Sequence, residues 1–201
     1  MKQFIIILTI GLFVSCSVSK RDVTTVSKEN GIILNGLTLN SGEDEVIISR
    51  DSISLEFDVF PYKSETKEWH AVKVAVTLDE SNLKYFQEGE IANSNPFYSY
   101  IGTGIATGKN QNYECMYVRN SGHHYIYYES ENDKRATVIK KYKNGKVRLK
   151  WTVKCFTIDK KVVQIKDSKM ERLYLMIFID NNLNKTIDRD EYSLITINFK
   201  Q

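Results

Sequence analysis

Oxygen-bearing side chains are concentrated in one short segment near the C-terminal end of the 201-residue chain. They stand at Asp180, Asn182, Asn184, Asp188 and Glu191, mostly two residues apart. Ca²⁺ is bound by about six to eight oxygens, and alternate residues of a tightly curled loop direct their oxygens towards one centre. The spacing indicates a calcium site, and the alternative is an ion-free connection in which Asn and Asp make local turns.

The segment resembles the twelve-residue calcium loop of EF-hand proteins. The resemblance implies the ligands Asp180, Asn182, Asn184, Thr186 (through its backbone carbonyl), Asp188 and Glu191. Loop position six is normally Gly, and Lys185 here predicts either a left-handed backbone at a lysine or a displaced curl. With three carboxylates among the ligands, we expect a weak structural site with a dissociation constant of roughly 10⁻⁴ to 10⁻³ M.

The residues on either side of this segment predict strands and not the two helices of an EF-hand. Residues 173–179 form a continuous apolar run typical of a buried strand, and residues 192–199 alternate between apolar and polar. We therefore expect the calcium loop to connect two strands.

The N-terminal residues have the layout of an export signal. Lys2 precedes an apolar run over residues 4–13, and small side chains follow it. The run is too short for a membrane-spanning helix, which needs about 20 apolar residues. We therefore expect residues 1–15 to be removed as a signal peptide.

The end of that signal, Phe13-Val14-Ser15-Cys16, resembles the lipobox of bacterial lipoprotein precursors, with Phe13 in place of the usual leucine. The resemblance implies that Cys16 is acylated and becomes the mature N-terminus, and ordinary cleavage after Ser17 is the alternative. It also implies a lipid anchor in the outer membrane, on the periplasmic side or at the cell surface. Residues 16–30 would then be the lipidated N-terminus and a polar tether, and residues 31–201 a single domain.

Two further cysteines, Cys115 and Cys155, remain after Cys16. Disulfides persist in the oxidising cell envelope. A bridge between these two cysteines would close a loop of about 40 residues, which the chain-entropy relation values at roughly 3 to 4 kcal/mol. Two buried free thiols are the alternative, and the sequence leaves both open.

The rest of the chain predicts one all-β domain. Short runs rich in Ile, Val, Phe and Tyr are separated by Asn, Gly, Ser and Asp. The predicted strands cover residues 32–39, 45–50, 53–60, 70–78, 98–106, 113–118, 125–129, 136–142, 146–158, 161–165, 172–179 and 192–199. Residues 79–89 predict a short helical turn. We expect a β-sandwich, jelly-roll-like or immunoglobulin-like, with a partly open β-barrel as the alternative.

The dipeptide Asn144-Gly145 predicts a two-residue type I′ hairpin turn, because both residues tolerate the positive φ that this turn requires. Such a turn would pair Lys143 with Lys146 and Lys141 with Arg148. Like charges would then lie opposite each other, which is mildly destabilising.

This hairpin is part of a strongly basic region. Residues 134–169 hold thirteen Lys and Arg against two acidic residues. The candidate anionic-ligand face consists of Lys141, Lys143, Lys146, Arg148 and Lys150. Anionic envelope polymers, glycans or headgroups are the expected partners, and nucleic acid is not expected in the envelope. The alternative is a solvated face whose lysines discourage aggregation.

Signals for catalysis are weaker. Glu129 and Glu131 share a predicted strand face and are the best pair of carboxylates for a glycosidase. Seven tyrosines between residues 97 and 128 could stack on sugars or pack in the core. His123 and His124 are adjacent, so in a strand they face opposite sides. We expect a non-enzymatic, membrane-anchored envelope lipoprotein with a binding or structural role. A carbohydrate-binding or carbohydrate-active lipoprotein is the alternative.

Overall fold

The computed structural model describes residues 29–60, 72–95, 113–118, 123–126 and 135–200. The described strands are β1 (Glu29–Leu34), β2 (Leu37–Asn40), β3 (Gly42–Ile48), β4 (Ile53–Val59), β5 (Val72–Thr77), β6 (Cys115–Tyr117), β7 (His123–Ile126), β8 (Thr137–Lys141), β9 (Val147–Val153), β10 (Cys155–Ile158), β11 (Lys161–Gln164), β12 (Arg172–Ile179) and β13 (Tyr192–Phe199). The helical elements in these ranges are short 3₁₀ helices, η1 (Glu80–Tyr85), η2 (Ala92–Ser94) and η3 (Ile165–Asp167). The prediction of an all-β architecture is confirmed for the described residues.

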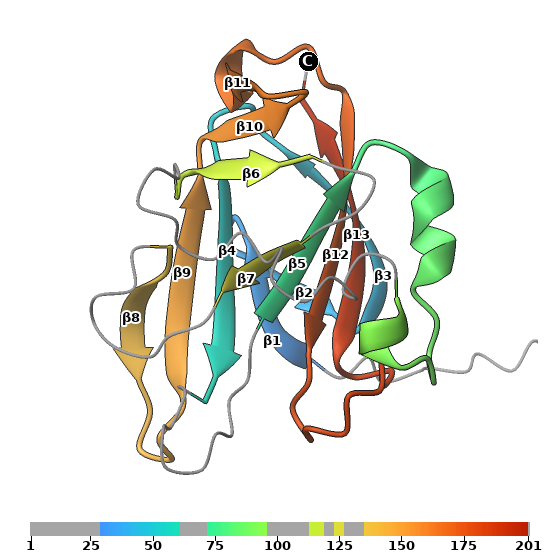
Figure 1. Ribbon diagram of the computed structural model, residues 1–201. Helices are drawn as coiled ribbons and strands as arrows, with labels where there is room; N and C mark the ends of the chain where they lie inside the picture. The colour runs from blue at the N-terminus through green and yellow to red at the C-terminus, as the bar shows by residue number, and fades with distance from the viewer. Residues whose placement is uncertain (1–28, 61–71, 96–112, 119–122, 127–134, 201) are drawn as a thin grey trace, which may run out of the picture.

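The strands form three open sheets (Figure 1). One five-stranded sheet has the order β2-β1-β4-β9-β8, and the other has the order β3-β13-β12-β5-β7. A three-stranded sheet, β11-β10-β6, lies at the end of the molecule that holds the C-terminus. Within the described ranges, no sheet closes on itself into a barrel.

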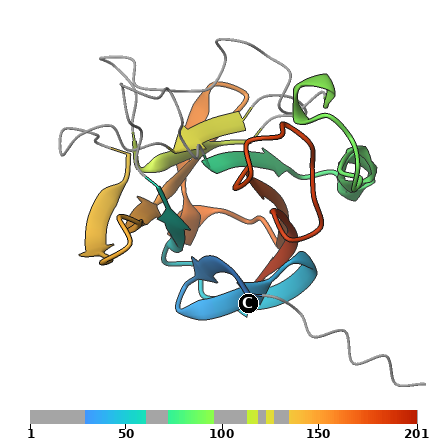
Figure 2. The ribbon, with the colours of Figure 1, turned by 90° about the horizontal axis from the view of Figure 1, so that it is seen from below.

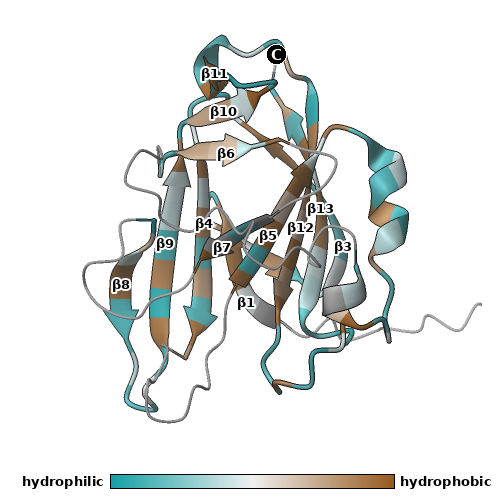
Figure 3. Cartoon of the chain, viewed as in Figure 1, coloured by the Kyte–Doolittle hydropathy of each residue, from teal (hydrophilic) through white to brown (hydrophobic). Residues whose placement is uncertain are grey.

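The two five-stranded sheets share one hydrophobic core. β4 and β9 alternate between buried and half-buried residues, and the hydropathy colours alternate along β9 in Figure 3. Their buried residues Phe57 and Trp151 belong to the same cluster as Leu175 of β12 and Ile195 of β13. Each sheet therefore buries one face against the other, and Figure 2 shows the strands around this core from below.

β12 is buried along almost its whole length because it is covered on both faces. Leu175 lies in the shared core, whereas Met176 and Phe178 pack in a second cluster with Phe86 and Ala92. Phe86 directly follows η1 and Ala92 begins η2, so the helical turns cover the outer face of this sheet. The helical turn predicted for residues 79–89 is confirmed by η1. The predicted bounds of β12 and β13 are also confirmed, to within one residue.

The segment predicted as one strand over residues 32–39 is two strands. Asn35 and Gly36 have φ values of 47° and 83° and turn the chain from β1 into β2. Leu34 then lies opposite Leu37 in an antiparallel pair. The turn signal is the same Asn-Gly dipeptide as at residues 144–145, but here it stands inside an apolar run.

The hairpin between β8 and β9 forms, but its predicted two-residue turn is wrong. Gly145 has a φ of 86°, whereas Asn144 is not among the residues with positive φ. The Tyr142 N–H donates to the Lys146 carbonyl at 2.9 Å, so the loop has three residues between this pair. The Asn144 side chain accepts the Lys146 N–H at 3.1 Å, which stabilises a turn that ends in a left-handed glycine.

The longer turn changes the register of the hairpin. Lys141 lies opposite Val147, and Lys140 lies opposite Arg148, with an irregularity between Val138 and Lys140. The predicted pairs of Lys143 with Lys146 and Lys141 with Arg148 are therefore wrong. The extra loop residue shifts the pairs next to the turn by one position, and the irregularity adds a second position at Val138 and Thr137.

The segment predicted as one strand over residues 146–158 belongs to two sheets. β9 ends at Val153, and β10 begins at Cys155. Lys154 lies between them, and its N–H donates to the Glu114 carbonyl at 2.8 Å, where pairing with β6 begins. The predicted strand over residues 98–106 lies outside the described residues.

Candidate metal centre

The oxygen-rich loop, residues 180–191, joins β12 to β13, two antiparallel neighbours at the centre of their sheet. The prediction that the loop connects strands is confirmed. At its mouth the Ile179 N–H donates to the Glu191 carbonyl at 2.8 Å. The first and last implied ligands, Asp180 and Glu191, are thereby held side by side.

The backbone of the loop turns sharply without a glycine. Lys185 has a φ of 63°, and Leu183 has a φ of 61°. Of the two alternatives that follow from a lysine at loop position six, the left-handed backbone is the one observed. A left-handed non-glycine residue costs about 1 to 3 kcal/mol unless its surroundings compensate.

Side-chain oxygens hold the curl by accepting backbone hydrogen bonds. Asn182 Oδ1 accepts the Asn184 N–H at 3.0 Å, and Asn184 Oδ1 accepts the Thr186 N–H at 2.7 Å. Asp180 Oδ2 accepts the Lys185 N–H at 3.0 Å, directly at the strained residue. The side chains of three implied ligands therefore stabilise the curled loop through hydrogen bonds that need no ion.

Two asparagine side chains of the loop donate hydrogen bonds to the same carboxylate oxygen, Asp188 Oδ2. The amides of Asn182 and Asn184 donate to Asp188 Oδ2 at 2.7 and 2.8 Å. Thr186 pairs with Ile91 in an isolated antiparallel bridge. Three of the implied ligands thus lie within hydrogen-bond distance of one another.

Two carboxylate oxygens at the base of the loop are buried and, within the described part of the chain, accept no hydrogen bond: Asp180 Oδ1 and Glu191 Oε2. Glu191 is only 3% exposed. Its Oε1 accepts the N–H groups of Asn181 and Asn182 at 2.7 and 3.0 Å. A buried carboxylate oxygen without a partner is costly. Both atoms belong to implied calcium ligands, so the donor set fits a hard cation.

The charges around these oxygens also favour a cation. Burial raises the pKa of Glu191, and the carboxylates of Asp180 and Asp188 raise it further, against the effect of its two backbone hydrogen bonds. The nearby cation is Lys73 of β5, whose pKa burial lowers and the Asp180 carboxylate partly restores. A divalent ion would relieve the repulsion among the three carboxylates.

The loop is tied to the segment between η1 and η2. The Ile187 N–H donates to the Glu90 carbonyl at 2.8 Å, and the Ile187 carbonyl accepts the Gly89 N–H at 2.9 Å. The Ala92 N–H donates to the Lys185 carbonyl at 2.8 Å. Ile187 is fully buried in the second cluster. The conformation of the loop is therefore coupled to residues 89–92.

In the described ranges no group of three or more His, Cys, Asp and Glu side chains is arranged to hold a metal by itself. The implied ligand set of the loop is different in kind, because it includes two asparagines and a backbone carbonyl. Binding at this loop would therefore depend on amide oxygens as well as on carboxylates.

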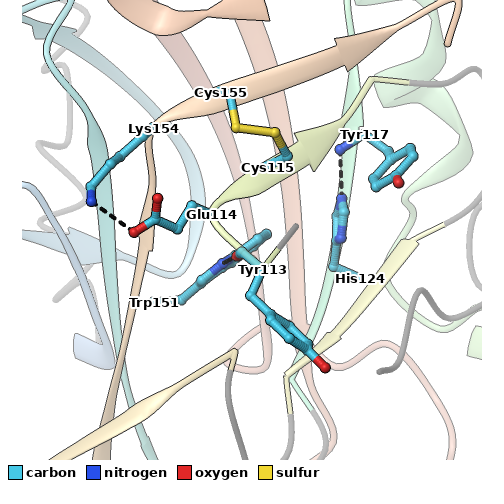
Figure 4. Close-up of a disulfide and its surroundings, with 8 residues drawn as sticks. All are labelled: Tyr113, Glu114, Cys115, Tyr117, His124, Trp151, Lys154 and Cys155. Carbon is cyan, nitrogen blue, oxygen red and sulfur yellow. Dashed lines mark hydrogen bonds and ion pairs between the residues drawn. A yellow bond between two sulfur atoms is a disulfide. The ribbon is translucent and has the colours of Figure 1, made fainter. Parts of the chain in front are cut away.

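Cys115 and Cys155 are joined by a disulfide (Figure 4). The two residues lie opposite each other in the parallel strands β6 and β10, with their Cα atoms 4.5 Å apart. Both are almost fully buried. Of the two alternatives that the sequence leaves open, the structure has the bridge.

The basic face predicted on β9 is partly neutralised by β4. Arg148 donates two hydrogen bonds of 2.7 Å to Asp58, and the Tyr142 hydroxyl donates to the same carboxylate at 3.0 Å. Burial alone would raise the pKa of Asp58, but the hydrogen bonds from Arg148 and Tyr142 outweigh it and lower the pKa. Lys150 lies 3.5 Å from Glu56. The other candidates, Lys141, Lys143 and Lys146, lie towards the hairpin tip.

A buried polar cluster beneath the disulfide carries no clear sequence signal. His124 is 1% exposed, and its Nε2 accepts the Tyr117 N–H at 3.0 Å. Its ring centroid lies 5.1 Å from that of Trp151, and Arg135 Nη1 lies 3.2 Å from its Nδ1. The Trp151 indole N–H donates to the Tyr113 carbonyl at 2.8 Å (Figure 4). These contacts hold the third sheet on the core.

Several sequence candidates lie outside the described residues: Cys16, the pair Glu129 and Glu131, and the tyrosines 98, 100, 127 and 128. Of the described segments, none is a helix with the length and apolar character needed to cross a membrane. No family model, no curated protein and no solved structure matches the chain.

Proposed function

We propose that this chain is a membrane-anchored lipoprotein of the bacterial cell envelope with a non-enzymatic binding or structural role, and that one calcium ion stabilises its domain. The observation that carries the calcium assignment is the pair of buried, unpartnered carboxylate oxygens of Asp180 and Glu191. They belong to the first and last positions of a loop that matches the EF-hand spacing.

The calcium ion has a structural part in this proposal. Asp180, Asn182, Asn184, Asp188 and Glu191 would supply side-chain oxygens, and Thr186 its carbonyl. Because the loop joins two central strands and hydrogen-bonds to residues 89–92, an ion bound only by the folded state would stabilise both. We also assign the two facing five-stranded sheets to a β-sandwich, jelly-roll-like or immunoglobulin-like, with the three-stranded sheet at one end.

An envelope location is supported by two independent features. The Cys115–Cys155 disulfide suits an oxidising compartment. Phe13-Val14-Ser15-Cys16 resembles a lipobox, and acyl chains at Cys16 would anchor the chain firmly because each buried CH₂ contributes about 0.8 kcal/mol. Millimolar calcium in such a compartment would match a weak loop.

Calcium titration of the purified chain by isothermal calorimetry tests the metal assignment. We expect one site with a dissociation constant of roughly 10⁻⁴ to 10⁻³ M, and loss of the binding heat in Asp180→Ala. Asp190→Ala is the matched control, because Asp190 is an exposed carboxylate of the same loop outside the ligand set. Binding heat that is absent from the wild type, or unchanged in Asp180→Ala, would refute the assignment.

Radiolabelled palmitate supplied to a Gram-negative host that expresses the full chain tests the anchor. We expect label in the wild-type protein and none in Cys16→Ser. The Cys115→Ser and Cys155→Ser double variant is the control, because its sulfurs are not the proposed acylation site. Label that persists in Cys16→Ser would contradict the proposal.

A further inference from the structure

The tip of the β8–β9 hairpin is a compact basic surface. Lys140, Lys141 and Lys143 are exposed, and Lys146 is half-exposed. The sequence of residues 137–158 contains no Asp or Glu. The observed three-residue turn places these four lysines around a single loop. A two-residue turn would have given them different cross-strand partners.

Part of the basic face lies against β4, away from the tip. Arg148 and Lys150 lie opposite Asp58 and Glu56 in the register of β4 and β9, and each contacts its opposite carboxylate. Those two cations therefore stabilise the sheet. The four tip lysines lie beyond these two contacts, around the loop that joins β8 to β9.

Two aromatic rings lie among the tip lysines. The Lys140 ammonium lies 4.6 Å from the centroid of the Tyr142 ring, and the Lys146 ammonium lies 5.3 Å from that of Phe60. Both rings are half-buried. A tyrosine such as Tyr142 suits the boundary between headgroups and acyl chains, because its ring is apolar and its hydroxyl is polar.

The first described strand, β1, begins at this same end. Gly31 of β1 lies against Asp58, since a Cβ built on Gly31 would be 3.3 Å from the Asp58 Cβ. Asp58 in turn is hydrogen-bonded to Tyr142 and Arg148 of the hairpin. Figure 1 shows the start of β1 and the β8–β9 tip at the end of the molecule opposite the C-terminus.

We propose that the β8–β9 tip binds the headgroups of anionic phospholipids in the bilayer that holds the N-terminal anchor. This inference rests on the proposed acylation of Cys16. Residues 17–28 then separate the anchor from β1. Even fully extended, they span at most about 40 Å. The anchor therefore keeps the start of β1, and with it the tip, near the membrane surface.

Charge supplies the affinity once the tip is close. Each lysine near an anionic leaflet increases the population of the bound state about fivefold. At the same end, the calcium loop carries Asp180, Asp188, Asp190 and Glu191 against Lys185 and Arg189. A bound divalent ion would cancel that excess of negative charge. We therefore expect calcium to strengthen contact between this end and anionic lipid.

The test compares lysine reactivity on vesicles of two compositions. The mature full-length protein is reconstituted into phosphatidylcholine vesicles with and without 30% phosphatidylglycerol, about one part in three, a content that gives a strongly negative surface. Acylation of each lysine by an amine-reactive reagent is then followed by mass spectrometry. Lys160 and Lys161 serve as internal controls, because they are exposed in the β10–β11 turn at the opposite end.

We expect the four tip lysines to react at least threefold more slowly on the anionic vesicles, and Lys160 and Lys161 to react equally on both. Replacing Lys140, Lys141 and Lys143 together by Gln should remove the protection of Lys146. The matched variant Lys160→Gln with Lys161→Gln should keep it. Equal reactivity of the tip on both vesicles would overturn the inference, as would protection by soluble polyphosphate but not by lipid.

Different results would refute the acylation of Cys16 and the binding of lipid by the β8–β9 tip. The mass of the N-terminal peptide reports acylation of Cys16 directly, so a chain without acyl mass refutes the anchor whatever the lysines do. An acylated chain whose tip lysines react equally on both vesicles keeps the anchor and refutes the tip. If Cys16 is not acylated, flotation of the chain with anionic vesicles would support lipid binding by the tip alone. A chain that neither carries acyl groups nor floats would refute both the anchor and the lipid-binding tip.

Discussion

The two ends of the molecule are closed by different kinds of link. At the end with the C-terminus, the Cys115–Cys155 disulfide joins β6 to β10 and so completes the three-stranded sheet. At the opposite end, the loop between β12 and β13 is closed by hydrogen bonds, and its carboxylates of Asp180 and Glu191 each have a buried oxygen that accepts no hydrogen bond in the described part of the chain. The first link is covalent and independent of the ions in solution. The second would respond to calcium.

This difference predicts which end should be sensitive to each change of conditions. Reductant should loosen the three-stranded sheet, and a chelator should loosen residues 180–191 together with residues 89–92, which hydrogen-bond to the loop. Amide hydrogen exchange separates the two responses because it reports stability region by region.

The largest effect should follow removal of the disulfide. Replacing Cys115 and Cys155 together by Ala should lower the free energy of unfolding by about 3 to 4 kcal/mol, because the unfolded chain regains the entropy of a 40-residue loop. Denaturant unfolding with and without reductant measures the loss. The double variant should also be insensitive to reductant. A wild-type protein equally stable in both conditions would contradict the covalent link.

Calcium should have the next largest effect, at the other end. At a calcium concentration about 100 times the dissociation constant, the wild type should gain about 2.7 kcal/mol of unfolding free energy. Glu191→Gln should lose most of that gain, because a neutral amide replaces the carboxylate at loop position twelve.

The same variant separates the ion from the hydrogen bonds. A glutamine oxygen can still accept the Asn181 and Asn182 N–H groups, and its neutral amide removes the repulsion from Asp180 and Asp188, so metal-free stability should not fall in Glu191→Gln. A gain with calcium that survives in Glu191→Gln would show that the ion binds elsewhere. Thermal unfolding with calcium and with chelator makes this measurement.

Acid should act on the β4–β9 pairing near the basic tip. The folded pKa of Asp58 is lowered, so its stabilising effect is complete above the unfolded value of about 3.9 and is lost as pH falls through the folded pKa. Asp58→Asn should cost about 1 kcal/mol or less at neutral pH, because the pair with Arg148 is partly solvated. The difference from wild type should shrink below pH of about 4. A constant difference would show that the charge of Asp58 is not what stabilises the pair.

The smallest effect concerns the left-handed Lys185 in the loop of residues 180–191. Lys185→Gly should raise the free energy of unfolding by about 0.5 to 1 kcal/mol, because glycine adopts the φ of 63° without steric cost. Arg189→Gly is the control, since Arg189 is not among the residues with positive φ and the change should destabilise. Chemical denaturation in chelator makes the comparison, and a loss of stability in Lys185→Gly would contradict the strain.

Strand positions are largely predictable because the pattern of apolar residues within a strand indicates which of its faces are buried. The continuous apolar run of β12 is a local signal, and this strand forms at the expected residues. The alternation along β9 also predicts a strand, but the expected run of residues 146–158 is divided between β9 and β10. The errors arise where local signals compete. Asn35-Gly36 turns the chain inside an apolar run, and Asn144 hydrogen-bonds to Lys146 in a way that selects a three-residue turn.

In the candidate metal centre, too, some features follow from the local sequence and others depend on tertiary packing. The spacing of the oxygen-bearing residues follows from twelve consecutive residues, and Lys185 at position six allows a left-handed backbone or a displaced curl, of which the structure has the first. The burial of Glu191 does not, because it depends on packing against neighbouring strands and on residues 89–92. The neutralisation of Arg148 by Asp58, 90 positions away, likewise requires the register of β4 and β9.

The sequence alone determined the all-β character, the oxygen-rich loop and the concentration of basic residues, because each depends on neighbours within about a dozen positions. Only the tertiary structure decided which sheet each strand joins, that Cys115 meets Cys155, and that Arg148 and Lys150 contact carboxylates of β4. These depend on contacts between distant segments, which form only when the whole core is assembled and which no local pattern encodes.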